Sequence, residues 1–69
     1  MNKIKISLNG EEKEINGNST IKDILEIINA KSPMLVVERN LEIVQKDQYE
    51  TCYLQDGDKL EVVSFFGGG

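Results

Sequence analysis

Polar and apolar residues alternate strictly over residues 3–8, which puts Ile4, Ile6 and Leu8 on one face. A period of two predicts a half-buried strand. Asn9-Gly10 follows, and because both residues tolerate positive φ, the pair predicts a tight hairpin turn. The return strand, residues 11–15, is rich in glutamate. That charge predicts an edge strand, because it discourages pairing with other molecules.

The period then changes to that of a helix. Thr20 is a predicted N-cap, and Asp23 three residues later nearly completes a capping box. Pro33 prevents the helix from continuing, so we expect a helix of about ten residues. A helix this short is not stable alone in water, so it must pack on a sheet. Ile27 widens the apolar stripe. The stripe itself has the spacing i, i+3, i+4, i+7 and consists of Ile21, Ile24, Leu25 and Ile28.

Three more apolar runs predict strands, at residues 34–38, 43–44 and 59–65, with a turn at residues 39–42. The last run carries apolar side chains on both faces, which is typical of a central strand. We expect it to pair with the first strand. The segment 46–53 has no clean period and is predicted to be irregular, with its two tyrosines folding it back over the core.

These elements predict an α+β roll, with one main helix packed on one face of a mixed sheet of four to five strands. We expect residues 1–66 to form a single domain and residues 67–69 to form a flexible glycine tail.

Size and charge narrow the function. The chain has 69 residues, 8 of them basic and 12 acidic, with a net charge of −4. This balance argues against binding nucleic acid and favours a basic partner surface. A core this small cannot also enclose a drug-sized cavity, so function is expected on a surface or at a terminus. The sequence has no membrane-length apolar run and no signal-peptide pattern. Its single cysteine suits a reducing compartment, and we expect a cytoplasmic protein that does not bind membranes.

The sequence contains few of the side chains that usually carry out catalysis. The sequence has no histidine, and Cys52 has no second cysteine to pair with. We expect Cys52 to be a small apolar residue in or near the core. Residues 56–58, Asp-Gly-Asp, lack the later ligands of a calcium loop and predict a sharp turn instead. We therefore expect no catalytic activity and no metal site in this chain.

The remaining reactive group is the C-terminal carboxylate of Gly69. It is ionised at neutral pH and is a poor electrophile, so a partner enzyme must activate it, for example by adenylation with ATP. Glycine backbone without side chains can thread through a narrow channel to reach such an enzyme.

With these features the chain resembles the ubiquitin-like β-grasp sulfur carriers, and it is most similar to the ThiS family of thiazole (thiamine) biosynthesis. The similarity covers nearly the whole length. Its motifs are the Asn9 hairpin, Thr20-Ile21-Lys22-Asp23-Ile24-Leu25, Asn40 with Ile43-Val44, Gln48-Tyr49, Leu54 to Glu61, and Gly68-Gly69.

The resemblance implies a reaction cycle. An E1-like, ThiF-like adenylyltransferase activates Gly69 with MgATP, and no cofactor is bound by this chain. Sulfur from a cysteine desulfurase then gives a thiocarboxylate, which a ThiG-like thiazole synthase consumes. The resemblance also implies that Gly68 and Gly67 thread the tail, and that Phe66 and Phe65 contact partners, although Phe65 also suits a core position. We expect the free chain to be a monomer.

Two positions depart from the family pattern. Gly67 makes the tail more flexible than a Gly-Gly pair requires, and Gln45 stands where relatives often have proline. Three other functions stay open at this point. The chain could be the small sulfur-carrying subunit of molybdopterin synthase, a protein modifier that forms isopeptide bonds, or a binding module whose tail is inert.

Overall fold

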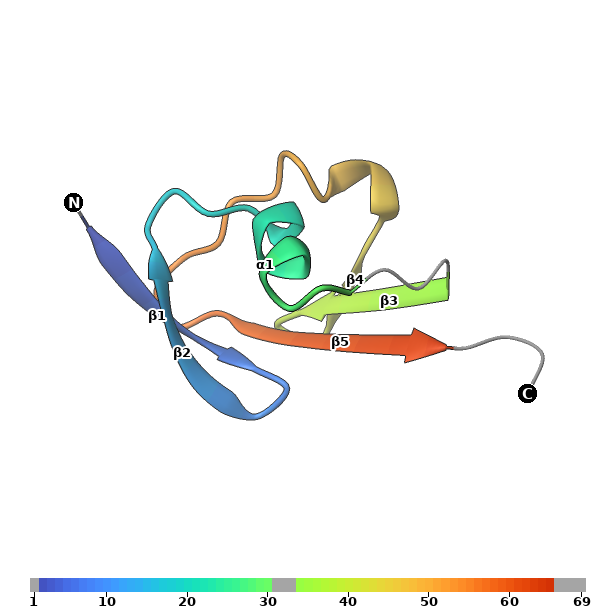
Figure 1. Ribbon diagram of the computed structural model, residues 1–69, viewed down its shortest axis with the longest axis horizontal. Coiled ribbons are helices and arrows are strands. Elements are labelled where there is room, and N and C mark those ends of the chain that lie inside the picture. Colours follow the sequence, from blue (N-terminus) through green and yellow to red (C-terminus); the bar gives the residue numbers. More distant parts are fainter. Residues whose placement is uncertain (1, 31–33, 66–69) are drawn as a thin grey trace.

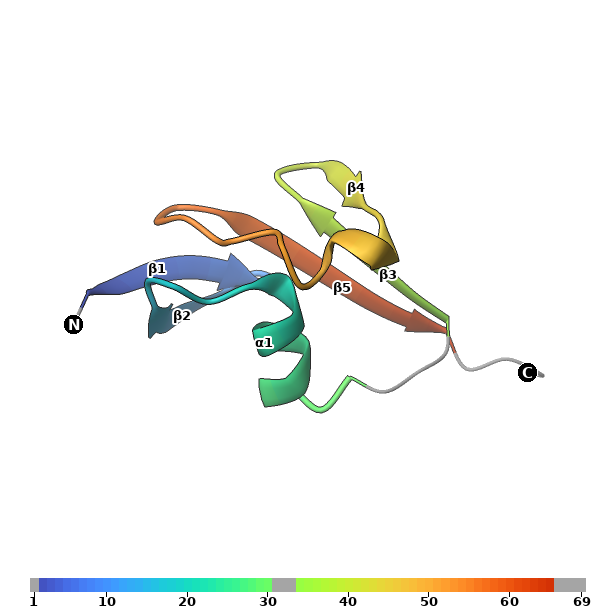
Figure 2. The same cartoon turned by 90° about the horizontal axis from the view of Figure 1, so that it is seen from above.

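A computed structural model describes residues 2–30 and 34–65, with the backbone alone for Phe65. Within these residues the fold is a five-stranded mixed sheet in the order β2-β1-β5-β3-β4, and one helix lies against one of its faces (Figures 1 and 2). The predicted fold class is confirmed. The elements in chain order are β1 (Lys3–Leu8), β2 (Glu11–Asn16), α1 (Ile21–Ile27), β3 (Met34–Arg39), β4 (Glu42–Val44), the 3₁₀ helix η1 (Lys46–Gln48) and β5 (Lys59–Phe65).

The first hairpin forms as its sequence predicts. β1 and β2 pair antiparallel, with Leu8 opposite Glu11, and Asn9 and Gly10 take φ angles of 50° and 85°. β2 lies at the sheet edge, and Ile15 points its side chain into the core. The glutamates of β2 therefore face solvent at the edge where they discourage pairing with another chain.

The last strand, β5, lies at the centre of the sheet, as predicted. It runs parallel to β1 and antiparallel to β3. The direct pairing with β1 involves only two residues of each strand. The side chain of Asn9 extends it: its Oδ1 accepts a hydrogen bond from the Val62 amide (2.8 Å), and its Nδ2 donates to the Val62 carbonyl (3.3 Å). A side-chain amide thus acts as one more peptide group in the ladder.

The helix α1 begins as predicted. Thr20 Oγ1 accepts from the Asp23 amide and Asp23 Oδ2 accepts from the Thr20 amide, which completes a capping box. Two further N–H groups of the first turn are satisfied by the segment after η1. Ile21 donates to the Cys52 carbonyl and Lys22 to the Tyr49 carbonyl.

The end of α1 corrects the prediction. The helix has seven residues rather than about ten, because Asn29 adopts a left-handed conformation (φ 59°) and ends it. The Asn29 amide donates to the Glu26 carbonyl and the Ala30 amide to the Leu25 carbonyl, which is the pattern of a Schellman motif. Ile27 and Ile28, predicted to belong to the apolar stripe, are 72% and 37% exposed.

The hydrophobic core lies between α1 and the sheet. Its tightest members are Ile21 from the helix and Ile6, Val37 and Leu60 from three neighbouring strands, each no more than 2% exposed. Among the described residues the buried apolar side chains are Ile6, Leu8, Ile15, Ile21, Ile24, Leu25, Val37, Leu54 and Leu60.

The segment between β4 and β5 is more ordered than predicted. It contains η1, and Tyr53 forms an isolated bridge with Thr20. Tyr49 folds back onto the core as expected, whereas Tyr53 is 59% exposed, so that part of the prediction is wrong. Cys52 is half-buried and packs against the core, as expected.

Candidate functional site

β5 leads toward the predicted reactive end of the chain. It is the central strand of the sheet and ends at Phe65, whose backbone lies opposite Met34 of β3. Phe66 and residues 67–69, predicted as the tail, fall outside the described residues, as does the Phe65 side chain. The roles predicted for these residues stay predictions. The surroundings of the strand that carries them are described next.

The sheet face opposite α1 is partly apolar where β5, β3 and β4 lie side by side. Val63 of β5 lies directly opposite Val36 of β3, and Ile43 of β4 lies opposite Glu38 of β3. Val63 and Ile43 are 45% and 63% exposed. The helix α1 lies against the other face of the sheet (Figures 1 and 2). We call the part of this sheet face that carries Val36, Ile43 and Val63 the open face.

Two carboxylates lie within this face. Glu38 of β3 and Glu61 of β5 are register partners, so two like charges face each other across neighbouring strands. The ion pairs formed among the described residues involve other acidic groups: Lys13–Glu11, Lys22–Glu50 and Arg39–Asp58. The open face therefore combines aliphatic side chains with negative charge.

A buried carboxylate holds the β3–β4 turn against the start of β5. Asp58 is 6% exposed. Its Oδ2 accepts from Arg39 Nε (2.9 Å) and from the Gln55 amide (2.8 Å), and its Oδ1 accepts from Asn40 Nδ2 (3.1 Å). Asn40 Oδ1 in turn accepts from the Lys59 amide (2.9 Å). We call these residues the Asp58 cluster.

The ionisation of this cluster is fixed by its contacts. Burial by itself raises the pKa of Asp58, but the hydrogen bonds from Gln55 and Asn40 and the Arg39 guanidinium together hold that pKa below its ordinary value. Burial lowers the pKa of Arg39, and the partner carboxylate outweighs it and raises that pKa. Asp58 therefore stays ionised near neutral pH and has a structural role. The sequence predicted only a turn here, and no sequence signal marked Arg39 as its partner.

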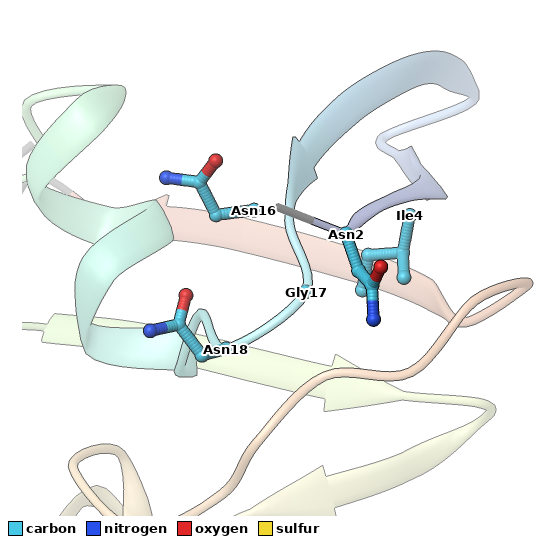
Figure 3. Close-up of a pocket in the computed structure, with 5 residues that line it drawn as sticks. All are labelled: Asn2, Ile4, Asn16, Gly17 and Asn18. Carbon is cyan, nitrogen blue, oxygen red and sulfur yellow. The ribbon is translucent and has the colours of Figure 1, made fainter.

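A surface pocket lies at the far end of the molecule from Phe65 (Figures 1 and 3). Ile4 lines it from β1 and Asn2 from the residue just before β1, while Asn16 lines it from the end of β2 and Gly17 and Asn18 from the link between β2 and α1. None of these side chains titrates, so the pocket offers no acid, base or nucleophile. The described residues contain no group of three or more His, Cys, Asp or Glu side chains that could hold a metal ion. None of the described helices is long and apolar enough to cross a membrane.

A mixed sheet whose first and last strands lie parallel at its centre, with a helix on one face, defines the β-grasp class. A family model described as the ThiS family matches residues 6–69. The chain belongs to the ThiS family.

Curated relatives agree with this assignment. The chain is 38% identical over 65 residues to the sulfur carrier protein ThiS of Bacillus subtilis, covering 93% of this chain and 98% of that protein. It is 44% identical over 66 residues to a thiazole synthase of Paramagnetospirillum magneticum, covering 96% of this chain and 20% of that protein. The chain thus spans only about a fifth of that relative's length.

A solved structure supports the fold. A thiamine biosynthesis protein (ThiS) from Geobacter metallireducens superposes with a TM-score of 0.80 at 23% identity, covering 96% of this chain and all of that one. At this level of identity the similarity establishes the fold alone.

Proposed function

We propose that this chain is the sulfur carrier for thiazole formation in thiamine biosynthesis, and that the sulfur is carried on the Gly69 carboxylate. The observation that carries the proposal is the ThiS family match, which extends over residues 6–69 and so includes the terminal glycines. A relative of nearly the same length is named sulfur carrier protein ThiS. The central position of β5 adds a physical reason, because the most firmly held strand of the sheet leads into the reactive end.

The chemistry needs an enzyme that this chain does not supply. The carboxylate of Gly69 attacks the α-phosphorus of MgATP, and pyrophosphate leaves. A persulfide then attacks the carbonyl carbon of the acyl adenylate and displaces AMP, which gives an acyl disulfide. A thiol attacks the sulfur of that disulfide that came from the persulfide carrier, so that a new disulfide forms and the thiocarboxylate leaves. We infer that an E1-like, ThiF-like enzyme holds the MgATP and that a cysteine desulfurase supplies the sulfur. The carrier contributes a folded body for recognition and an unbranched end, so it acts as a co-substrate.

The acceptor is inferred from relatives. Two proteins named thiazole synthase, from Paramagnetospirillum magneticum and Magnetococcus marinus, contain a stretch similar to this chain. Their names support a thiazole synthase as the partner that takes the sulfur, in preference to a molybdopterin synthase. We also infer a cytoplasmic location, since MgATP and a reduced Cys52 suit that compartment.

The test is an intact-mass measurement after incubation with MgATP, a ThiF-like activating enzyme and a sulfide source. We expect a mass gain that matches replacement of one oxygen by sulfur, located on Gly69 by peptide mass analysis. A chain with one alanine added after Gly69 should show no gain. The matched control carries the same alanine before Met1 and should behave like the parent chain.

Two outcomes would contradict the proposal. The first is normal sulfur transfer from the C-terminally extended chain. The second is covalent attachment of the chain to lysines of other proteins without thiocarboxylate formation, which would identify a protein modifier. Supply of the thiocarboxylate to a purified thiazole synthase then tests the acceptor.

A further inference from the structure

The turn between β3 and β4 holds a leucine in a conformation that leucine rarely adopts. Asn40 and Leu41 have φ angles of 52° and 71°. In this left-handed region the Cβ of an L-residue crowds the following carbonyl, so tight hairpin turns favour glycine or asparagine. At Asn40 the strain of the positive φ is offset by the hydrogen bonds that its side chain makes with Asp58 and Lys59. Leu41 has an aliphatic side chain, which cannot form such bonds.

Packing within the chain does not offset this strain. Leu41 is 86% exposed, which is the highest exposure among the large hydrophobic side chains of the described residues. A single exposed leucine is ordinary on a protein surface. An exposed leucine in a strained conformation is not, because glycine at this position would remove both the strain and the exposed apolar surface. Strain of this kind is a reason to look for function.

Leu41 lies at one end of the open face. Ile43 follows it on β4, at the level of Glu38 and Glu61, and Val36 and Val63 lie two residues further toward the end of β5. The β3–β4 turn and the end of β5 lie at opposite ends of this face (Figure 2). Lys59 of β5 lies at the level of the turn, and Phe65 lies six residues further along the strand. Six residues of a strand span about 20 Å. One partner surface of ordinary size, about 800 Å² per protein, spans that distance.

Charge indicates what kind of partner fits. Glu38 and Glu61 face each other within the open face, and neither takes part in the ion pairs of the described residues. Two adjacent like charges disfavour the isolated sheet. A lysine or arginine from a partner would remove this repulsion and fix the orientation of docking.

We propose that Leu41 and Ile43 anchor the docking of the enzyme that activates Gly69. That enzyme presents an apolar pocket to Leu41 and a basic side chain to Glu38 and Glu61, while its active site holds the glycine end that follows Phe65. The left-handed turn leaves the leucine side chain exposed at the end of the β3–β4 hairpin, where a partner can reach it. This inference rests on the proposed function, since the partner is defined by what it does to Gly69.

The test measures pyrophosphate release by a ThiF-like activating enzyme from the same organism at increasing carrier concentration. Leu41→Ala removes the side chain and keeps the strained Cβ, whereas Leu41→Gly removes both. Both variants should raise KM for the carrier about tenfold, from the lost burial of one leucine, and leave kcat unchanged. Ile27→Ala is the control, because Ile27 is an exposed aliphatic residue on α1 (72%), and this variant should keep the parent KM.

Thermal unfolding provides the second measurement. Leu41→Gly should unfold about 2–4 °C above Leu41→Ala, because relief of the strain exceeds the added entropy of glycine in the unfolded chain. A lower Tm for the glycine variant would overturn the argument from strain.

Three kinetic outcomes would overturn the docking proposal: a parent-like KM for Leu41→Ala, an equal rise in KM for Ile27→Ala, or normal activation combined with slower sulfur delivery to thiazole synthase. The last would assign the surface to the acceptor enzyme. Failure of the proposed function looks different, because the parent chain itself would then release no pyrophosphate.

Discussion

The two faces of β3 and β5 differ sharply, although the same strands form both. Toward α1, Val37 and Leu60 are at most 1% exposed, and they belong to the core. On the other side, Val63 is 45% exposed and lies beside Glu38 and Glu61, the two carboxylates that face each other across the strands. Successive side chains of a strand point to opposite faces, so one position along the chain separates a residue that holds the fold together from one that is available to partners. A domain this small can therefore devote one face to stability and the other to recognition.

The largest expected effect is on the covered face. Leu60→Ala should lower the free energy of unfolding by about 3 kcal/mol, because it removes buried surface and leaves a cavity. A chain of this size is expected to have only roughly 3–10 kcal/mol in total, so the variant would lose at least about a third of its stability. Urea unfolding followed by circular dichroism measures the loss. A loss below about 1 kcal/mol would show that the core relaxes around the gap.

The next effect concerns the Asp58 cluster, which holds the β3–β4 turn against the start of β5. Asp58→Asn should cost about 2 kcal/mol at neutral pH, because the amide cannot accept all three hydrogen bonds or pair with the Arg39 charge. Urea unfolding at several pH values measures this.

The pH dependence of the Asp58 effect has a definite sign. The folded-state pKa of Asp58 is lowered relative to about 3.9 in the unfolded chain, so its contribution is present above that value and is lost as the pH falls through the folded-state pKa. The difference between parent and Asp58→Asn should therefore shrink below about pH 4. A difference that stays constant down to pH 2 would contradict the role of the ionised carboxylate.

A smaller effect is expected where the covering helix begins. Thr20→Ala should cost about 1 kcal/mol, because the Asp23 amide loses its partner in the capping box. Thr51→Ala is the matched control, since Thr51 is exposed and its hydroxyl makes only a long contact of 3.4 Å to the Gln48 carbonyl. Chemical denaturation of both variants gives the comparison. Equal losses would mean that the cap is not what stabilises this end of α1.

The smallest effect tests the comparison directly. Val63→Thr keeps the β-branched shape and should change the free energy of unfolding by no more than about 0.5 kcal/mol, because the hydroxyl stays in contact with water. The same substitution at Val37 buries a hydroxyl group and should cost about 1–3 kcal/mol. Matched unfolding curves decide the difference. Similar costs at both positions would show that the open face also contributes to stability.

Most of the fold could be predicted because its signals are local. Alternation identified β1, the Asn9-Gly10 pair identified the hairpin, and Thr20 with Asp23 identified the start of α1. Apolar side chains on both faces also identified β5 as the central strand. The end of α1 was predicted wrongly, because Asn29 ended the helix before Ile28 could join the apolar stripe. Asparagine tolerates the left-handed conformation, and that was a signal in the sequence that the expected stripe outweighed.

Some residues of the candidate site could likewise be predicted from the sequence, and others could not. The terminal glycines and the two phenylalanines before them were identified from the sequence alone, and their roles stay predictions. The pairing of Glu38 with Glu61 could not be foreseen, because the 22 residues between them do not reveal the register of β3 on β5. The strain at Leu41 was also hidden, since a leucine after asparagine gives no sign of a positive φ.

The sequence by itself determined the order of the elements and the alternation that assigns each side chain to a face. It also predicted a reactive carboxylate at Gly69, whose role stays a prediction. These depend on nearest neighbours and on covalent chemistry. Only the tertiary structure decided which charges face each other, which carboxylate is buried, and which leucine is held outward under strain. Those features arise from contacts between residues far apart in the sequence, where register and backbone conformation are set by the packing of the whole sheet.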